Sequence, residues 1–450
     1  MIRYSLYDIA NLTGGQLLPN SHEKQEIQGL STDSRQPMLG QLFVALQGER
    51  FDGADFASAA LAQGATAVLT ARAVDAPGVL VKDTLAALQT LTSHWRQCFK
   101  LPLLAVTGSC GKTTVKEVLT AILHETGPVL ATRGNQNNHI GVPLTLARLG
   151  AEHRYAVLEM GMNHPGELTL LSTLAKPTLA LINNAAPAHL EGLGTVAAVA
   201  AAKGEILSGL DSRGITILNG DDAFADFWAE KAPGEVWRFS LENRAVRVRG
   251  HWHGHTDNGG HLEVHAPQGQ FSVEIPLPGK HNGGNVLAAV TAALALDIPI
   301  PQIQRAVMGL QAIPGRLQWR SGLQDSRILD DTYNANPASL EAALRVLAAQ
   351  QGQRILILGD MGELGSESAL YHRQAGMLAK QLGIDAVYGL GTLAAEAVEA
   401  FGVRGESFTA LAPLLEALQP LLNADTVVLV KGSRSAHMER VVQSLSRGDA

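Results

Sequence analysis

The most constraining feature of this sequence is a glycine-rich turn between an apolar strand and a helix. Residues 103–108 read Leu-Leu-Ala-Val-Thr-Gly, which suits a buried parallel strand, and a helical pattern runs from residue 111 to about 125. Glycines in such a turn let successive backbone N–H groups point at phosphate oxygens, and the helix N-terminus adds partial positive charge. The segment therefore predicts a phosphate-binding loop made of Gly108, Ser109, Gly111, Lys112, Thr113 and Thr114.

Two features beside this loop predict a metal site. In loops of this kind the lysine reaches the terminal phosphate and the next hydroxyl ligates Mg²⁺, which here means Lys112 and Thr113. Glu159 lies near the end of another apolar run, residues 155–160, and carboxylates at the carboxyl ends of parallel strands face the ligand crevice. Glu159 is therefore a candidate Mg²⁺ ligand, directly or through water. The simpler interpretations are a solvated lysine in a glycine-rich turn and an ordinary surface glutamate.

Strands and helices alternate over most of the 450 residues, which predicts an α/β fold with several domains. We expect a small N-terminal α/β domain at residues 1–82. A central P-loop domain with a doubly wound, mostly parallel sheet is expected at residues 83–313. Within it, residues 235–277 alternate in polarity between Gly and Asn residues, which predicts antiparallel hairpins. A C-terminal Rossmann-like α/β domain is expected at residues 314–450.

Charge and composition exclude several classes of protein. The formal net charge of −7 argues against a protein that coats nucleic acid or an anionic membrane. Two cysteines, Cys98 and Cys110, are too few for a disulfide scaffold or a zinc site of several thiolates. The N-terminal residues do not read as a signal peptide, and no apolar stretch reaches the roughly 18 residues of a membrane span. We expect a cytoplasmic monomer without membrane insertion.

The loop and several later motifs resemble those of the Mur ligases, the ATP-dependent amide-forming enzymes of peptidoglycan precursor synthesis. The usual phosphate loop has a further glycine where this chain has Val106, and the shortened form Thr-Gly-x-x-Gly-Lys-Thr is the one that this family carries. The other matching segments follow in order along nearly the whole chain. They are Asn-Gln-Asn-Asn at 135–138, Glu159, Asn-Asn at 183–184 with His189, Ala-Lys-Gly-Glu at 202–205, Gly-Lys-His-Asn at 279–282 with Asn285, and Pro-Gly-Arg at 314–316.

Two further stretches resemble one branch of the family. Asp-Asp-Thr-Tyr-Asn-Ala-Asn-Pro at 330–337 and Gly-Asp-Met-Gly-Glu-Leu-Gly at 359–365 are similar to motifs of the members that add D-alanyl-D-alanine to a UDP-N-acetylmuramoyl tripeptide. The segment around residues 183–190 also fits that branch. The Asp-Tyr-Ala-His-Thr-Pro-Asp and Asp-Asn-Pro-Arg signatures of the diaminopimelate- or lysine-adding members do not occur in these regions.

The resemblance implies a reaction with ATP and Mg²⁺ as cofactors. ATP would phosphorylate the terminal carboxylate of the tripeptide, and the amine of D-alanyl-D-alanine would attack the acyl phosphate. The products would be the UDP-muramoyl pentapeptide, ADP and phosphate. Two alternatives stay open: a ligase of this or the folylpolyglutamate synthase type with another amine substrate, and a P-loop switch or ATPase that makes no bond.

The resemblance also assigns roles residue by residue. Lys112, His189, Lys203 and Arg316 would be catalytic. The metal ligands would be Thr113, Glu159, His189 and Lys203, the last after carbamylation, although the sequence alone shows only a lysine on an alanine-rich helix. Beyond the phosphate loop, ATP would be bound by His281, Asn282, Asn285, Arg316, Asp330, Tyr333, Asn334 and Asn336. The UDP-linked substrate would be bound by Ser31, Thr32, Asp33, Ser34, Arg35, Asn137 and Asn138.

Three other groups of residues carry weaker signals. Five histidines between residues 251 and 265 suggest a metal cluster, but their strand-like spacing in a variable region favours solvated side chains. Cys110 lies inside the phosphate loop, where a small residue suffices. The run Lys-Gly-Ser-Arg at 431–434 either positions the incoming dipeptide or forms an ordinary turn at a helix start.

Overall fold

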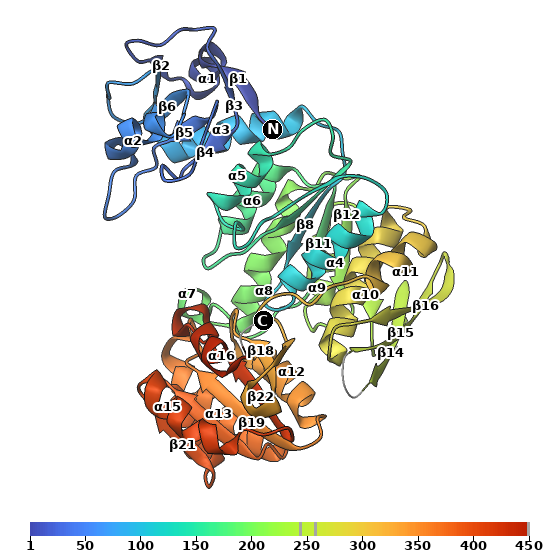
Figure 1. Ribbon diagram of the computed structural model, residues 1–450. Coiled ribbons are helices and arrows are strands. Elements are labelled where there is room, and N and C mark those ends of the chain that lie inside the picture. Colours follow the sequence, from blue (N-terminus) through green and yellow to red (C-terminus); the bar gives the residue numbers. More distant parts are fainter. Residues whose placement is uncertain (243–244, 256–258, 448–450) are drawn as a thin grey trace.

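The computed structural model describes residues 1–242, 245–255 and 259–447, which form three α/β units in chain order (Figure 1). The strands of the first unit are β1 (Arg3–Ser5), β2 (Gln16–Leu17), β3 (Glu26–Gln28), β4 (Leu30–Ser31), β5 (Leu42–Val44), β6 (Ala67–Thr70) and β7 (Gly78–Leu80). They make a sheet in the order β2-β7-β6-β5-β4 and a separate β1-β3 ribbon. The helices α1 (Leu6–Thr13) and α2 (Ala57–Ala62) complete the unit.

Helix α3 (Thr84–Gln97) connects the first unit to the second. The carboxylate of Asp83 caps its first turn by accepting hydrogen bonds from the backbone N–H groups of Leu85 and Ala86. Near its end Arg96 is buried, and its guanidinium donates to the carbonyl oxygen of Ala175 at 3.0 Å. This buried arginine fixes α3 on the second unit.

The second unit is built on a nine-stranded sheet. Its strands are β8 (Leu103–Thr107), β9 (Val129–Ala131), β10 (Tyr155–Glu159), β11 (Leu179–Ile182), β12 (Ile215–Asn219), β13 (Glu235–Ser240), β14 (Val248–His255), β15 (Gly259–Ala266) and β16 (Gly269–Ile275). The order is β16-β15-β14-β13-β12-β11-β8-β10-β9. All pairs from β9 to β14 are parallel, and only β14-β15-β16 is antiparallel.

The expectation of antiparallel hairpins across residues 235–277 is therefore wrong for its first part. β13 pairs in parallel with both β12 and β14. Helix α9 (Ala225–Ala229), which lies between β12 and β13 in the chain, returns the chain to the same end of the sheet and so makes the β12–β13 pair parallel.

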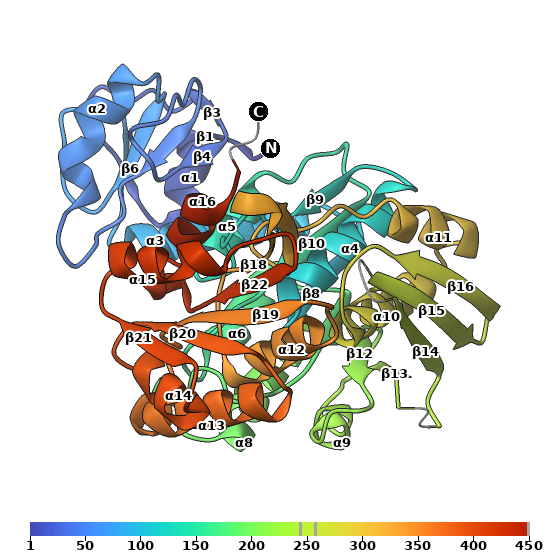
Figure 2. The same ribbon diagram turned by 60° about the horizontal axis from the view of Figure 1, so that its bottom comes forward.

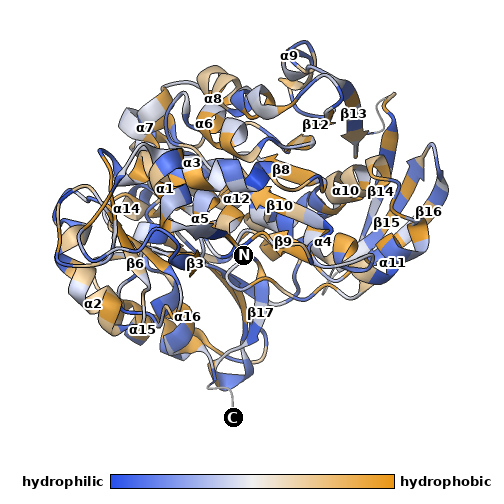
Figure 3. Cartoon of the chain, turned by 90° about the horizontal axis from the view of Figure 1, so that it is seen from above, coloured by the Kyte–Doolittle hydropathy of each residue, from blue (hydrophilic) through white to orange (hydrophobic). Residues whose placement is uncertain are grey.

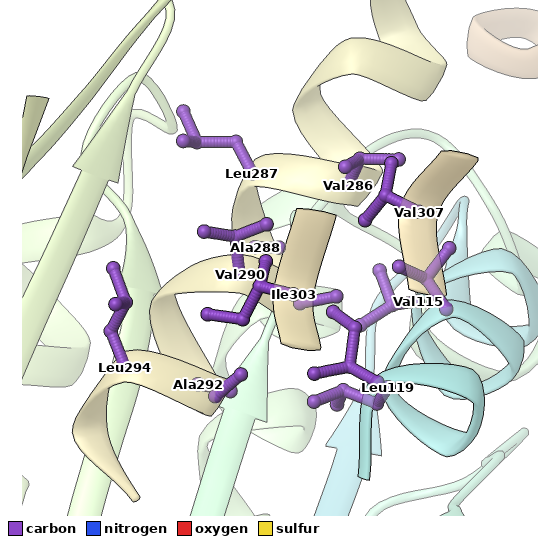
Figure 4. Close-up of a cluster of buried hydrophobic side chains, with 14 of the residues drawn as sticks. Val115, Leu119, Val286, Leu287, Ala288, Val290, Ala292, Leu294, Ile303 and Val307 are labelled. Carbon is purple, nitrogen blue, oxygen red and sulfur yellow. The ribbon is translucent and has the colours of Figure 1, made fainter. Parts of the chain in front are cut away.

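Helices cover both faces of this sheet (Figures 1 and 2). They are α4 (Lys112–His124), α5 (Gly141–Ala147), α6 (Glu167–Ala175), α7 (Leu190–Leu193), α8 (Val196–Gly204), α9, α10 (Lys280–Ala295) and α11 (Ile300–Met308). Figure 4 shows α4, α10 and α11 joining their apolar side chains in one cluster on one face. The apolar residues of α5, α6 and α8 join a second cluster with the opposite side of β8.

Strand β8 is apolar on both sides because both of its faces are covered. Leu104 and Val106 belong to the first cluster, whereas Leu103 and Ala105 belong to the second. In the hydropathy view of Figure 3, β8 and β9 are correspondingly orange. Helix α10 begins at Lys280, so the predicted nucleotide-binding residues His281, Asn282 and Asn285 lie in its first turns.

The third unit has a six-stranded sheet. Its strands are β17 (Gln318–Ser321), β18 (Arg327–Asp331), β19 (Gln353–Gly359), β20 (Ala386–Leu390), β21 (Gly405–Phe408) and β22 (Thr426–Lys431). The order is β17-β18-β22-β19-β20-β21, parallel except for β17. The helices are α12 (Pro337–Ala348), α13 (Ser368–Gln381), α14 (Ala394–Phe401), α15 (Leu411–Leu418) and α16 (Glu439–Leu445). The edge strands β17 and β21 are short, and more polar than the four strands between them.

Within the described residues, no helix has both the length and the apolar character needed to cross a bilayer.

Candidate active site

The phosphate loop is fixed by side chains from neighbouring elements. Gly111 has φ 79°, and a Cβ there would lie 2.2 Å from Oδ1 of Asn285, so only glycine fits. The backbone N–H of Cys110 donates to Oδ1 of Asn184 at 2.9 Å. The Asn183 and Asn184 amides both donate to the Cys110 carbonyl oxygen, at 3.0 and 3.1 Å. The two asparagines that follow β11 thus hold the loop that follows β8, its neighbour in the sheet.

A chain of asparagine side chains links the loop to helix α10. The Asn183 amide donates to Oδ1 of Asn285 at 2.9 Å, and the Asn285 amide donates to Oδ1 of Asn282 at 3.1 Å. All three side chains are buried. Each amide group donates a hydrogen bond to the next one, so these buried polar groups have partners. The start of α10 is thereby held beside the phosphate loop.

Lys112 points back over the loop. Its Nζ donates to the carbonyl oxygen of Gly108 at 2.7 Å. Burial lowers the pKa of Lys112, while the nearby Glu159 carboxylate opposes this shift. A partly buried ammonium beside backbone N–H groups attracts anions.

Three oxygen-bearing side chains meet next to the loop. Glu159, at the end of β10, is buried. Its carboxylate accepts hydrogen bonds from the Thr113 hydroxyl at 2.7 Å and from the Asn137 amide at 2.9 Å. Among the described residues it has no ion-pair partner. A buried carboxylate with only neutral hydrogen-bond donors and adjacent hydroxyl and amide oxygens suits a hard divalent cation.

Lys203, in helix α8, is one of the largest fully buried side chains in the described part of the chain. It forms no hydrogen bond or ion pair with another described residue. Burial first, and the charge of Lys112 second, lower the pKa of Lys203 well below its ordinary value. A buried, unpaired ammonium is costly, so the neutral amine is favoured here.

Side chains of the third unit contact the phosphate loop. Asn336, the N-cap of α12, donates from its amide to the Ser109 carbonyl oxygen at 3.4 Å and accepts from the Cys110 thiol at 3.2 Å. Arg316 donates to the Thr113 hydroxyl at 2.8 Å, and its guanidinium lies 4.2 Å from the ring centre of Tyr333. The carboxyl ends of the two large sheets therefore face each other.

A second contact between the units pairs His189 with Glu363. Nδ1 of His189 lies 2.7 Å from Oε2 of Glu363. The contact with His189 is the main reason why the pKa of the Glu363 carboxyl is lowered. The backbone N–H of Glu191 also donates to the Glu363 carbonyl oxygen at 3.3 Å.

His281 lies where α10 meets the third unit. Lys431 donates to the Asp331 carboxylate and to the Asn334 carbonyl oxygen. Burial, only partly opposed by Asp331, lowers the pKa of His281 to about 4. The imidazole is therefore neutral at physiological pH.

One cavity of about 1360 Å³ lies between the second and third units. Its walls bring together most of the residues predicted to bind nucleotide, metal or substrate: Ser109, Gly111, Lys112, Thr113, Thr114, Asn137, Asn138, Glu159, His189, His281, Asn282, Asn285, Arg316, Tyr333, Asn334 and Asn336. Gly108 and Lys203 are not among the lining residues.

Two groups of residues that were predicted to bind nucleotide or substrate do not line this cavity. The carboxylate of Asp330 accepts hydrogen bonds from Arg320 and Thr332 at 2.9 and 2.7 Å, whereas the next residue, Asp331, lines the cavity. The segment Ser31 to Arg35 lies on the first unit, outside this lining. There Arg35 donates to the Asp33 carboxylate at 2.8 and 3.0 Å.

The structure adds lining residues that were not assigned to the site. Glu363, Asp331, Asn183 and Asn184 lie within the matched motifs, which are the sequence signal for them. Trp252, on β14, also lines the cavity and packs against Gly283. It lies in the hairpin region outside every motif, so no sequence signal pointed to it.

The histidines of the hairpin pair across strands. His253 lies opposite His261, and His251 is a diagonal neighbour of His265, with ring centres 6.1 and 6.0 Å apart. His261 also lies 2.7 Å from Glu274. The side chain of His255 falls outside the described residues, and within the described ones no group of three metal-binding side chains exists.

Comparison with known proteins agrees with this arrangement. Family models match three consecutive parts of the chain: the Mur ligase family catalytic domain at residues 26–96, the Mur ligase middle domain at 106–293, and the Mur ligase glutamate ligase domain at 315–434. The UDP-N-acetylmuramoyl-tripeptide–D-alanyl-D-alanine ligase of Escherichia coli strain K12 is 43% identical over 99% of both chains. The chain belongs to the Mur ligase family.

Solved structures of Mur ligases support the arrangement of all three units. A crystal structure of MurF from Acinetobacter baumannii matches with a TM-score of 0.93 at 34% identity, over 99% of each chain. MurF from Thermotoga maritima in complex with ADP matches with a TM-score of 0.83 at 27% identity, over 92% of this chain and 96% of that one.

Proposed function

We propose that this Mur ligase joins D-alanyl-D-alanine to UDP-N-acetylmuramoyl tripeptide at the expense of ATP, which gives the pentapeptide precursor of peptidoglycan, ADP and phosphate. The observation that carries the proposal is the 43% identity, over 99% of both chains, to an Escherichia coli protein named for this reaction. The facing carboxyl ends of two parallel sheets, with a phosphate loop between them, supply a site of the required kind.

The reaction has two steps. The terminal carboxylate of the tripeptide attacks the γ-phosphorus of ATP, the bond from that phosphorus to the β,γ-bridging oxygen breaks, and ADP leaves. The amine of the dipeptide then attacks the acyl phosphate carbon, loses a proton and expels phosphate. Activation is needed because a carboxylate is a poor electrophile, and the enzyme's contribution is chiefly alignment and charge neutralisation.

Lys112 and Arg316 supply positive charge to the transferred phosphoryl group. Lys112 comes from the loop itself and is partly buried beside it. Arg316 comes from the chain just before the third unit and reaches the Thr113 hydroxyl, so its charge arrives when the units close. His281, Asn282, Asn285, Tyr333, Asn334 and Asn336 are proposed to hold the nucleotide.

Mg²⁺ fits the donor set around Glu159. The Glu159 carboxylate and the Thr113 hydroxyl offer hard oxygen ligands, and the carboxylate lacks a cationic partner among the described residues. When bound, the ion would neutralise phosphate charge. A second ion would use His189 and carbamylated Lys203, since a neutral buried amine can add CO₂ and become an anionic oxygen ligand.

The substrates are assigned by charge and position. The hydroxyls and Arg35 of the segment Ser31, Thr32, Asp33, Ser34 and Arg35 suit the UDP diphosphate. Asn137 and Asn138 are proposed for the tripeptide end. Arg434, which lines the cavity from the third unit, suits the carboxylate of D-alanyl-D-alanine. The division into functional domains at 1–82, 83–313 and 314–450, a monomeric state and a cytoplasmic location belong to the same proposal.

Amine competition tests the proposed substrate. Phosphate release is measured with ATP, Mg²⁺, UDP-N-acetylmuramoyl tripeptide and either D-alanyl-D-alanine or single amino acids. The proposal predicts release with the dipeptide only. Release with a single amino acid, and none with the dipeptide, would reassign the chain to another ligase of the family.

A further inference from the structure

The indole of Trp252 is held between its own hairpin and helix α10, at the wall of the cavity. Trp252 lies on β14, is half-buried and packs against the apolar cluster around α10. A Cβ at Gly283, on α10, would lie 2.7 Å from Cε3 of the ring, and a Cβ at Gly260, on β15, would lie 2.4 Å from Cη2. Both distances are shorter than a van der Waals contact, so only glycine at these positions leaves room for the indole. The ring therefore has one fixed place, from which it lines the cavity.

The order of the strands places Trp252 and Glu159 on opposite sides of the phosphate loop. The loop follows β8. One neighbour of β8 is β10, which ends at Glu159, and the strands from β11 to β14 lie on the other side. Helix α10 spans the distance from the loop to the indole. Its Asn285 meets Gly111 of the loop, where a Cβ would lie 2.2 Å from Oδ1, and its Gly283, two residues earlier, contacts Trp252. A nucleotide whose terminal phosphates face Glu159 thus has its base on the side of Trp252.

One part of the cavity wall is apolar, and Trp252 belongs to it. The two units contribute Phe239, Leu241 and Trp252 from the second, and Ala342, Val346 and Ala349 from helix α12 of the third. Val346 lies against the start of α10, since its Cγ2 is 2.7 Å from the position of a Cβ at Gly279. Aromatic and aliphatic side chains stabilise a flat ring rather than a phosphate. The polar loop and this apolar wall together match a nucleotide, with its phosphates at one end and its base at the other.

We propose that Trp252 is a specificity-determining residue of the nucleotide site, because its indole supplies the surface on which the adenine base of ATP stacks. Base–aromatic stacking strengthens the binding of a ligand that carries a base and does nothing for a bare polyphosphate. A purine has two fused rings and a pyrimidine has one, so the stacked apolar area is larger for adenine than for uracil.

This selectivity matters for the proposed reaction because two of its substrates are nucleotides. ATP carries adenine, and the tripeptide substrate carries UDP. A phosphate loop binds phosphates through backbone N–H groups and a lysine, which do not distinguish the two bases. Stacking on Trp252 favours the adenine nucleotide at the loop. The inference rests on the proposed function for the identity of the two nucleotides, whereas the stacking itself does not require the ligation reaction.

Competition for the loop tests the role of Trp252. An ADP labelled on its ribose with the fluorescent N-methylanthraniloyl group is displaced by ADP, UDP or inorganic tripolyphosphate, in the wild type and in Trp252→Ala. The Kd of ADP should rise about 5- to 150-fold in Trp252→Ala, the range for loss of one base–aromatic stack. The Kd of tripolyphosphate should change less than about twofold, because it has no base to stack. The preference for ADP over UDP should fall.

Two further variants separate stacking from a general effect on the hairpin. Trp252→Phe keeps a smaller aromatic ring and should bind ADP more tightly than Trp252→Ala does. His253→Ala removes an exposed ring from the same strand, outside the cavity lining, and should keep the wild-type Kd values. A wild-type Kd for ADP in Trp252→Ala, or an equal rise for ADP and tripolyphosphate, would overturn the inference.

Fluorine NMR tests the same contact without removing the ring. The chain has five tryptophans, which 5-fluorotryptophan labels together, and the signal of Trp252 is the one that Trp252→Phe lacks. ADP should shift this signal, and tripolyphosphate should leave it in place. A Trp252 signal that ADP does not move would overturn the inference. Absence of the pentapeptide in the wild type, with these effects of ADP intact, would count against the proposed function and leave the role of Trp252 standing.

Discussion

The hydroxyl of Thr113 donates a hydrogen bond to the carboxylate of Glu159 across 2.7 Å, which joins the helix after the phosphate loop to the end of the neighbouring strand β10. Asn137 donates to the other carboxylate oxygen at 2.9 Å. Both donors are neutral, so they hydrogen-bond to the Glu159 carboxylate without neutralising its negative charge. This relationship identifies the place where added positive charge is most favourable.

Replacement of Glu159 should therefore weaken the response to Mg²⁺. Glu159→Gln keeps the shape and hydrogen-bonding capacity of the side chain and removes its charge. We expect the Mg²⁺ concentration for half-maximal phosphate release to rise about tenfold or more, in the range typical of altered metal sites. Glu230→Gln, an exposed change on the same unit, is the control. An unchanged Mg²⁺ titration in Glu159→Gln would exclude Glu159 as a ligand.

Replacement of Lys112 should abolish most turnover without unfolding the protein. Lys112→Met keeps the aliphatic stem and removes the charge that faces the γ-phosphate. Loss of one preorganised electrostatic group typically lowers kcat about 10²- to 10³-fold. Because burial lowers the pKa of Lys112, removing its charge should not lower the melting temperature. Full activity in this variant, measured by phosphate release, would remove Lys112 from the mechanism.

Carbamylation of Lys203 can be tested by chemical rescue. Lys203→Ala should lose activity, and a short carboxylic acid such as acetate should restore part of it by occupying the space of the carbamate. Lys116 is also buried, but it pairs with Glu117 and the Thr132 carbonyl oxygen, so Lys116→Ala is the matched control. The carbamate proposal would lose its support if acetate restored neither variant, or both equally.

Stability should fall on mild acidification because of His281. Its pKa is about 4 in the folded protein and 6.5 ordinarily, so between these values the unfolded chain binds more protons. The contribution of His281 is fully present above pH 6.5 and is lost as the pH falls toward 4, by at most about 3 kcal/mol. Urea unfolding at pH 7 and pH 5 should show a smaller loss for His281→Asn than for the wild type. Equal losses would contradict the assigned shift.

The parts of the site that follow from local chemistry were predictable from the sequence. The phosphate loop was recognised because Gly111 and Lys112 act through backbone geometry that a short segment defines. Glu159 was found because a carboxylate at the end of a buried parallel strand must reach the crevice. Neither inference needed knowledge of the distant parts of the chain.

Other features of the site depend on the register of the strands and on the relative placement of the second and third units. A short segment of sequence determines neither of them. Asp330 and Asp331 are consecutive in β18, so their side chains point to opposite faces, and only the strand register decides which one lines the cavity. Asp330 accepts a hydrogen bond from Arg320 on the edge strand β17. The contact of Glu363 with His189 required the relative placement of two units. The parallel pairing of β13 depended on the short helix α9 before it.

The central claim is that the chain makes an amide bond through an acyl phosphate, and an oxygen-isotope experiment tests it most directly. UDP-N-acetylmuramoyl tripeptide, labelled with ¹⁸O in its terminal carboxylate, is incubated with ATP, Mg²⁺ and D-alanyl-D-alanine, and all products are analysed by mass spectrometry. The account predicts the pentapeptide together with phosphate that carries one ¹⁸O atom from the carboxylate. Unlabelled phosphate, or ADP formed without the pentapeptide, would contradict it.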